Sequence, residues 1–163
     1  MEHSIEGRRL LAEFQFLVDR FGFTQSIPTF GAGQNLAETD YTCAPLRIET
    51  SYNPRDGHNV SLAYPSRGPH AISVGVLASS LFSKGDPAEI PSPDNLRLQS
   101  DFVRSHLDAL LKMPLEVYED CRALRFYHSA NWRNEWGRAI VMDAATIPVE
   151  SARLDRLRRY FAA

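Results

Sequence analysis

Apolar and polar residues alternate along residues 46–64, on both sides of a segment rich in turn-forming residues. Alternation is typical of a half-buried β-strand, because successive side chains of a strand point to opposite faces of the sheet. The turn-forming segment is 53–57, Asn-Pro-Arg-Asp-Gly,. The pattern therefore predicts a β-hairpin with one buried face. The residues expected on that face are Leu46, Ile48, Thr50 and Tyr52 on the first strand and Val60, Leu62 and Tyr64 on the second.

A helical period precedes the hairpin. Apolar residues recur there at the spacing of one helix face, and Gly22 is expected to end the helix,. Two short strands are expected between this helix and the hairpin, at 23–27 and 39–43, with a glycine-rich loop at 31–35 between them,. The apolar face of the helix would consist of Leu10, Phe14, Leu17, Val18 and Phe21.

Residues 72–82 fit both a strand and a helix, and we expect a strand that gives way to a short helix,. Residues 83–93 contain several prolines and are expected to form a surface loop,. The stretch 126–142 is rich in aromatic residues but has no clear period, and its last four residues fit either a strand or a helix.

Three further amphipathic helices are expected in the second half of the chain. Capping and proline signals place their starts at Ser92-Pro93-Asp94, after Pro114 and at Pro148,. Their apolar faces would be formed by Leu96, Val103, Leu107, Leu110 and Leu111; by Leu115, Tyr118, Cys121 and Leu124; and by Val149, Leu154, Leu157 and Phe161.

Together these elements predict an α+β fold. It has an N-terminal helix, an antiparallel sheet built as a meander around the hairpin, and C-terminal helices packed on one face of the sheet. With 163 residues, of which 44% are hydrophobic, the chain is expected to form a single α+β domain over residues 1–163,. Such a scaffold hosts many functions, so the function has to be argued from specific residues.

Charge and composition exclude several classes of partner and compartment. The formal net charge is −2, which gives no general electrostatic basis for binding nucleic acid,. No stretch is apolar enough to span a membrane, and the N-terminus lacks the basic and apolar regions of a signal peptide,. Cys43 and Cys121 are the only cysteines, and we expect them to be reduced,. These features predict a cytoplasmic protein.

The sequence contains no motif that specifies a catalytic or metal site. The histidines and cysteines have none of the close spacings that zinc sites use, so no metal or other cofactor is expected,. Cys121 lies on an apolar helical face and Cys43 has no helix start beside it to activate its thiol,. The glycines at 31–35 lack the lysine of a phosphate-binding loop,. His106 is expected to be a partly exposed packing residue, and His58, in the hairpin turn, to face solvent.

Two groups of residues are candidates for contact with a partner protein. Trp132, Arg133 and Trp136 combine the residue types that dominate binding hot spots, although tryptophans four positions apart on a helix are more often part of a core,. Asp40, Glu49 and Asp56 lie around the predicted sheet in a mildly acidic half of the chain, and these acids would suit a basic partner,. Glu49, Asp56 and the neighbouring Tyr52 are the contact residues predicted there. Residues 1–91 carry 7 cations and 10 anions, a net charge of 7 − 10 = −3.

The arginines near the C-terminus could in principle contact phosphates. They are interleaved with acids and lie in the last turns of a predicted helix, where cations stabilise the helix dipole,. We therefore expect them to serve the helix end and solubility. These arginines are Arg153, Arg156, Arg158 and Arg159.

Residues 8–64 contain three elements in a fixed order. A helix that ends in Phe21-Gly22-Phe23 is followed by a weak strand and then by a hairpin whose turn carries Arg55-Asp56. In this order they resemble a group of small bacterial α+β proteins, some of which are immunity proteins of secreted polymorphic toxins. The resemblance implies a binding protein and not an enzyme. It implies an immunity-type protein that neutralises a cognate toxin by occupying or distorting the active site of that toxin.

Two other hypotheses remain open at this point. One is a small enzyme or ligand-binding domain, with a site between sheet and helices formed by Glu49, Asp56, Tyr52 and His58,. The other is an adaptor or chaperone for a secreted effector, which would also bind through a groove and aromatic anchors.

Overall fold

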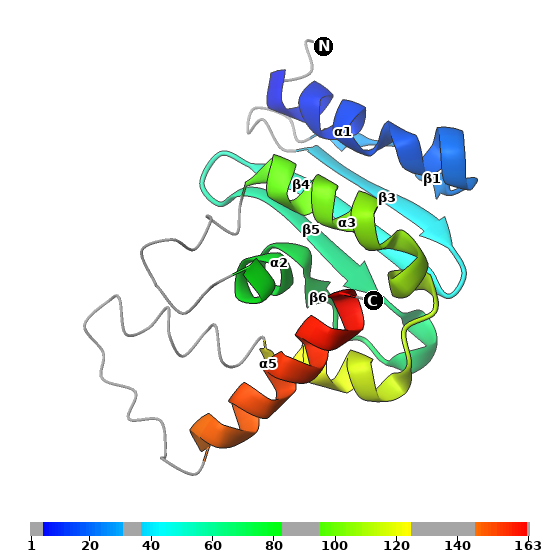
Figure 1. Cartoon of the computed structure of the whole chain (residues 1–163). Helices are drawn as coiled ribbons and strands as arrows, with labels where there is room; N and C mark the ends of the chain where they lie inside the picture. The colour runs from blue at the N-terminus through cyan, green and yellow to red at the C-terminus, as the bar shows by residue number, and fades with distance from the viewer. Residues whose placement is uncertain (1–4, 31–36, 83–94, 125–145, 163) are drawn as a thin grey trace.

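A six-stranded antiparallel sheet forms one side of the molecule, and helices precede and follow it along the chain (Figure 1). The structure is a computed structural model, and it describes residues 5–30, 37–82, 95–124 and 146–162. The predicted α+β fold is confirmed. The expected loops at 31–35 and 83–93 and the aromatic stretch 126–142 lie outside the described residues.

Most of the sheet is a meander, in which consecutive strands of the chain pair in space, but the first strand pairs with the third and not with the second. Its order is β1-β3-β4-β5-β6, and β2 also pairs with β3. The strands are β1 (Thr24–Gln25), β2 (Thr29–Phe30), β3 (Ala37–Cys43), β4 (Leu46–Asn53), β5 (Gly57–Ala63) and β6 (Ile72–Ser73). The outer strands are therefore much shorter than the three in the middle, which limits the unpaired edge that the sheet presents.

The predicted hairpin is confirmed as β4 and β5. Asn53 pairs with Gly57 across the turn, and Asn53 Oδ1 accepts a hydrogen bond of 2.9 Å from the backbone N–H of Arg55. Gly57 has a φ of 76°, a conformation that favours glycine,. The residues expected on the buried face are buried there, except Tyr52, which is half-buried.

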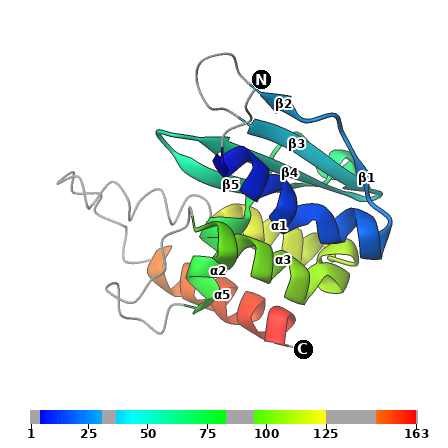
Figure 2. The ribbon, with the colours of Figure 1, turned by 90° about the horizontal axis from the view of Figure 1, so that it is seen from above.

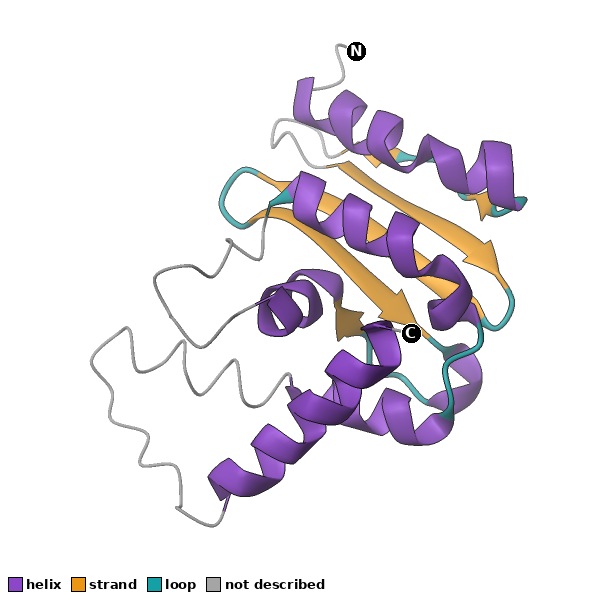
Figure 3. Ribbon diagram, in the orientation of Figure 1, coloured by secondary structure: helices purple, strands orange, loops and turns teal. Residues whose placement is uncertain are grey.

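All described α-helices lie on one face of the sheet (Figures 2 and 3). They are α1 (Ile5–Phe21), α2 (Val74–Phe82), α3 (Leu96–Leu111), a helix over 115–124, and α5 (Thr146–Ala162); a short 3-10 helix, η1 (Pro65–Arg67), follows β5. Helix α1 contacts β3 and β4, α2 and α3 contact β5, and α5 packs on α2 and α3. The transition from β6 to α2 confirms the strand and short helix expected at 72–82. Among the described residues, no helix has the length and apolar composition needed to cross a bilayer.

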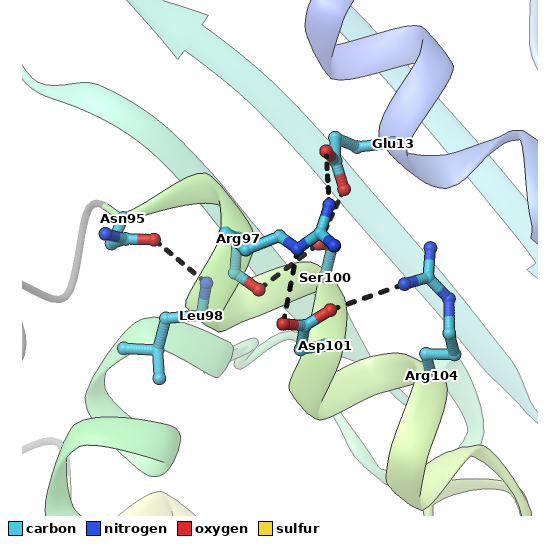
Figure 4. Close-up of polar contacts among 7 residues, drawn as sticks. All are labelled: Glu13, Asn95, Arg97, Leu98, Ser100, Asp101 and Arg104. Atoms are coloured by element: carbon cyan, nitrogen blue, oxygen red, sulfur yellow. Dashed lines mark hydrogen bonds and ion pairs between the residues drawn. The ribbon is translucent and has the colours of Figure 1, made fainter.

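Polar contacts join α1 to α3 above the sheet (Figure 4). Glu13 of α1 accepts a hydrogen bond of 2.9 Å from the hydroxyl of Ser100 and pairs with Arg97 at 3.4 Å. Arg97 also pairs with Asp101, one turn further along α3. Glu13 therefore fixes how the first helix of the chain sits against a helix more than eighty residues later.

The helix starts differ from those expected. Asn95, and not Ser92, caps α3, because its Oδ1 accepts a hydrogen bond of 2.9 Å from the backbone N–H of Leu98,. Helix α5 begins at Thr146, so Pro148 lies inside its first turn, where a missing N–H leaves no helical hydrogen bond unmade,. The side chain of Val149 lies outside the described residues.

Two residues assigned to apolar helix faces are exposed. Phe21 is 46% exposed and Leu115 is 60% exposed, whereas Phe16, which the helical spacing did not select, is buried. Both exposed residues lie at a helix end, and the spacing rule does not show how far the neighbouring layer extends there. Phe21 packs edge-on against the ring of Phe16 at 6.1 Å.

Two of the C-terminal arginines join helices to one another, in addition to the role at the helix end and in solubility that the sequence predicts. Arg156 makes a two-pronged contact with the buried carboxylate of Asp120, at 2.8 and 2.9 Å, and Arg153 lies 3.7 Å from the same group. The contact stabilises the charged form of Arg156 and raises its pKa. These arginines therefore attach α5 to the helix over 115–124.

Gln99 of α3 completes the edge of β5 where β6 is too short to cover it. Its side-chain oxygen accepts from the backbone N–H of Val60 at 2.9 Å, and its side-chain nitrogen donates to the carbonyl of His58 at 3.0 Å. Strand β6 pairs only with Ser61 and Leu62 of β5. The buried amide of Gln99 thus takes the place of a peptide group in a neighbouring strand,.

Replacing Gln99 with leucine is expected to lower the free energy of unfolding by about 2–6 kcal/mol. The substitution leaves a buried N–H and a buried carbonyl without partners, at about 1–3 kcal/mol each. Urea denaturation would measure the change. Gln15→Leu is a matched control, because Gln15 is exposed on α1 and its loss should cost under about 0.5 kcal/mol,. Equal stability of the two variants would contradict the role of Gln99.

Candidate functional site

The face of the sheet opposite the helices is polar, and no described helix covers it (Figure 2). We call this surface the open face. It arises because β3, β4 and β5 alternate, so the residues between the core positions point away from the helices. Its residues are Glu38, Asp40 and Thr42 on β3, Arg47, Glu49 and Ser51 on β4, Asn59 and Ser61 on β5, and Ser73 on β6. Three carboxylates and one arginine give it a net negative charge.

Asp40 and Glu49 are direct neighbours across β3 and β4. The peptide groups of Asp40 point away from β4, because its N–H donates to Ser26 Oγ at 2.9 Å and its carbonyl accepts from the N–H of Ser26 at 2.8 Å. In an antiparallel ladder this orientation marks the narrower kind of pair, in which the side chains lie closer together. Two carboxylates are therefore held side by side at the centre of the open face.

Arg47 offsets part of this negative charge. Its Nε and Nη2 donate to Glu49 Oε1 at 3.0 and 2.7 Å. Asp40 has no such bond, and its pKa is raised, first by partial burial and then by the charge of Glu49, against a smaller lowering by Arg47. The raised pKa of Asp40 means that the folded protein disfavours the charged form of this carboxyl,.

An exposed apolar residue lies at the edge of the same surface. Ile27 is 90% exposed, and it lies between Ser26, which bonds Asp40, and Thr29, which pairs with Glu38. The sequence predicts a strand over 23–27, but the strand formed there is β1 (Thr24–Gln25), and Ile27 lies beyond its end. The following Pro28 was the available signal, since a proline interrupts edge pairing and leaves the residue before it outside the ladder.

The three predicted partner-binding residues that the structure describes do not form one surface. Glu49 lies on the open face, as expected, and Asp56 lies in the hairpin turn with its side chain 70% exposed. Tyr52 lies on the opposite, helix-covered face, where its ring is 4.7 Å from that of His58. Trp132, Arg133 and Trp136 lie outside the described residues.

The expectation that His58 faces solvent is wrong. Its position in β5 places it on the helix side of the sheet, where it is 9% exposed and its Nε2 lies 2.9 Å from Glu6 Oε2 of α1. The turn-forming residues extend to Gly57, so the sequence predicts that His58 lies at the turn. In the structure Gly57 already pairs with Asn53, and His58 pairs with Tyr52 within the ladder. The four groups of the alternative enzyme site are thus divided between the two faces of the sheet and the turn.

Cys121 and His106 have the packing roles that the sequence predicts. Cys121 is buried, and burial raises the pKa of its thiol to about 12, far from the range of a reactive cysteine,. Cys43 and Cys121 are both free thiols. His106 is half-buried and packs against the rings of Phe102 and Phe161, as expected. Within the described ranges, no three His, Cys, Asp or Glu side chains come together as a metal site would require.

Replacing Asp40 with asparagine is expected to stabilise the protein at neutral pH. The pKa of Asp40 is higher in the folded protein than in the unfolded chain, so ionisation of Asp40 lowers the stability of the fold once the pH exceeds the ordinary pKa of 3.8,. The full loss of stability is present above the raised pKa,. The gain in thermal midpoint should therefore be largest near neutral pH and vanish below about pH 3.8,.

Thermal unfolding followed by circular dichroism at several pH values would test this. Asp108→Asn is the matched control, because Asp108 is an exposed acid on α3 that pairs with Lys112 at 2.9 Å. It should bring no gain at any pH. A gain for Asp40→Asn that does not depend on pH would contradict the electrostatic cause.

Comparisons with known proteins bear on neither the fold nor the site, since no family model, no curated protein and no solved structure matches this chain. The resemblance of residues 8–64 to immunity proteins therefore stays a prediction. The open face, with Asp40 and Glu49 at its centre, is the feature on which a functional proposal can rest.

Proposed function

We propose that this protein is an immunity-type binding protein, which neutralises a cognate bacterial toxin by holding a basic surface of that toxin against the open face. The observation that carries the proposal is the polar, net negative sheet face that no described helix covers. Complementary charge speeds association and selects the correct partner. The three carboxylates of the open face meet this need.

The contacts of several buried or half-buried polar side chains also favour a binding protein over an enzyme. Gln99 and the Asp120–Arg156 pair join structural elements to one another. His58 lies between Glu6 and Tyr52 on the helix side of the sheet. The carboxylates of the open face lie on the sheet, and a rigid sheet lowers the entropy cost of binding a partner,.

Exposed Ile27 adds an apolar contact beside the charged centre. Productive interfaces combine an apolar anchor with a polar surround, and charge alone contributes more to rate and selectivity than to affinity. We place Ile27 at the border of the contact area, next to Glu38 and Asp40.

Charge reversal on the open face tests the proposal. The protein encoded beside this chain would be co-expressed with it, isolated by affinity capture, and its dissociation constant measured at low and high salt. Glu38→Lys is expected to weaken binding at least about tenfold at low salt and less at high salt, because exposed charges are screened. Glu38 is exposed, so the substitution should leave the fold intact.

Asp108→Lys is the matched control, because it makes the same change of charge on α3, away from the open face. It should leave binding unchanged. The proposal is overturned if no neighbouring protein binds and none is toxic in the absence of this chain, or if Asp108→Lys weakens binding as much as Glu38→Lys. An effector that is bound but not toxic would instead support an adaptor or chaperone.

A further inference from the structure

An open pocket of about 420 Å³ lies at the end of the open face. Arg47 and Glu49 form its polar side, and Ala63 and the segment 65–71 form its mostly apolar side. Its volume is near the lower end of the range for small-ligand sites and suits one long side chain better than a whole ligand.

The wall formed by 65–71 is held in place from the helix side of the molecule. Arg67 donates a hydrogen bond of 2.6 Å to the carbonyl of Met113, and its guanidinium lies over the rings of Tyr64 and Tyr118, at 5.4 and 5.5 Å. Gly68 has a φ of 129°, which side-chain-bearing residues rarely adopt,. The pocket is therefore preformed, and an occupant does not have to order its wall.

One carboxylate oxygen of the pocket is left to accept a hydrogen bond from an occupant. Both hydrogen bonds from Arg47 end on Glu49 Oε1, and among the described residues no donor bonds Oε2. The charges of the lining residues Arg47 and Glu49 balance one another. Asp40 is not part of the lining, but as the cross-strand neighbour of Glu49 it adds a second carboxylate beside the pocket.

We propose that this pocket receives an arginine side chain of the partner protein, and the inference rests on the function proposed above. The guanidinium would bond Glu49 Oε2, and its aliphatic stem would lie along Ala63, Pro65 and Ala71. Arginine fits better than lysine, because its planar, weakly hydrated head pairs with carboxylates in a fixed geometry and packs on apolar surfaces.

The test uses the full chain and a small probe, N-acetyl-arginine methylamide, in an NMR titration of backbone amides. The amides of Ala63, Gly68 and Ala71 are expected to shift, with a dissociation constant on the order of 1–10 mM for a single side chain. The citrulline analogue, which has the same shape without the charge, and the lysine and glutamate analogues should each bind at least about tenfold more weakly.

Two variants separate charge from shape. Glu49→Gln should weaken the arginine probe at least about tenfold and, by freeing Arg47, strengthen the glutamate analogue. Ala71→Leu should fill the pocket and abolish the shifts without changing any charge. Asp108→Asn, the control on α3, should bind as the unmodified chain does.

The inference is overturned if the arginine probe causes no shifts, if citrulline or lysine binds as well, or if Glu49→Gln binds arginine unchanged. These outcomes are independent of the proposed function. If a toxin is captured and Glu38→Lys weakens its binding while Ala71→Leu does not, the proposed function is retained and the arginine pocket is rejected. Probe binding without any toxin partner would retain the pocket and reject the function.

Discussion

The one-sided burial of the sheet is the constraint on which the rest of the structure depends. Ile48 and Thr50 of β4 point into the helical layer, and Arg47 and Glu49 point away from it. A slip of one residue in the pairing would exchange these two sets and place charges in the core. The register of β3, β4 and β5 therefore follows from burial, and the composition of the open face follows from the register.

Side chains from the helical half of the chain complete what the sheet leaves unfinished. The amide of Gln99 closes the edge of β5 beyond the short β6, and Arg67 ties the segment after β5 to the end of α3. Asp120 and Arg156 join the helix over 115–124 to α5 in the same way. Each contact links residues more than thirty positions apart, so the sheet and helices are stabilised together.

The open face contains a local arrangement that does not favour stability. Like charges directly opposite one another across two strands are unfavourable, and Asp40 and Glu49 form such a pair in its narrower geometry,. Only part of this charge is offset by Arg47. Proteins commonly retain such arrangements at functional surfaces, where the charge has a use outside the folded chain. This is the physical reason for placing function on the sheet and not among the helices.

The sequence by itself determined the hairpin, the α+β class, the helix ended by Gly22 and the polar face to which Glu49 belongs, because these depend on local periods of two and 3.6 residues. Only the tertiary structure decided that His58 is buried beside Glu6, that Ile27 is exposed, and that Asp40 faces Glu49. It likewise decided the partners of Gln99 and Asp120. These features depend on strand register and on contacts between distant segments, and a periodic pattern shows which face of an element is apolar but not what lies against it.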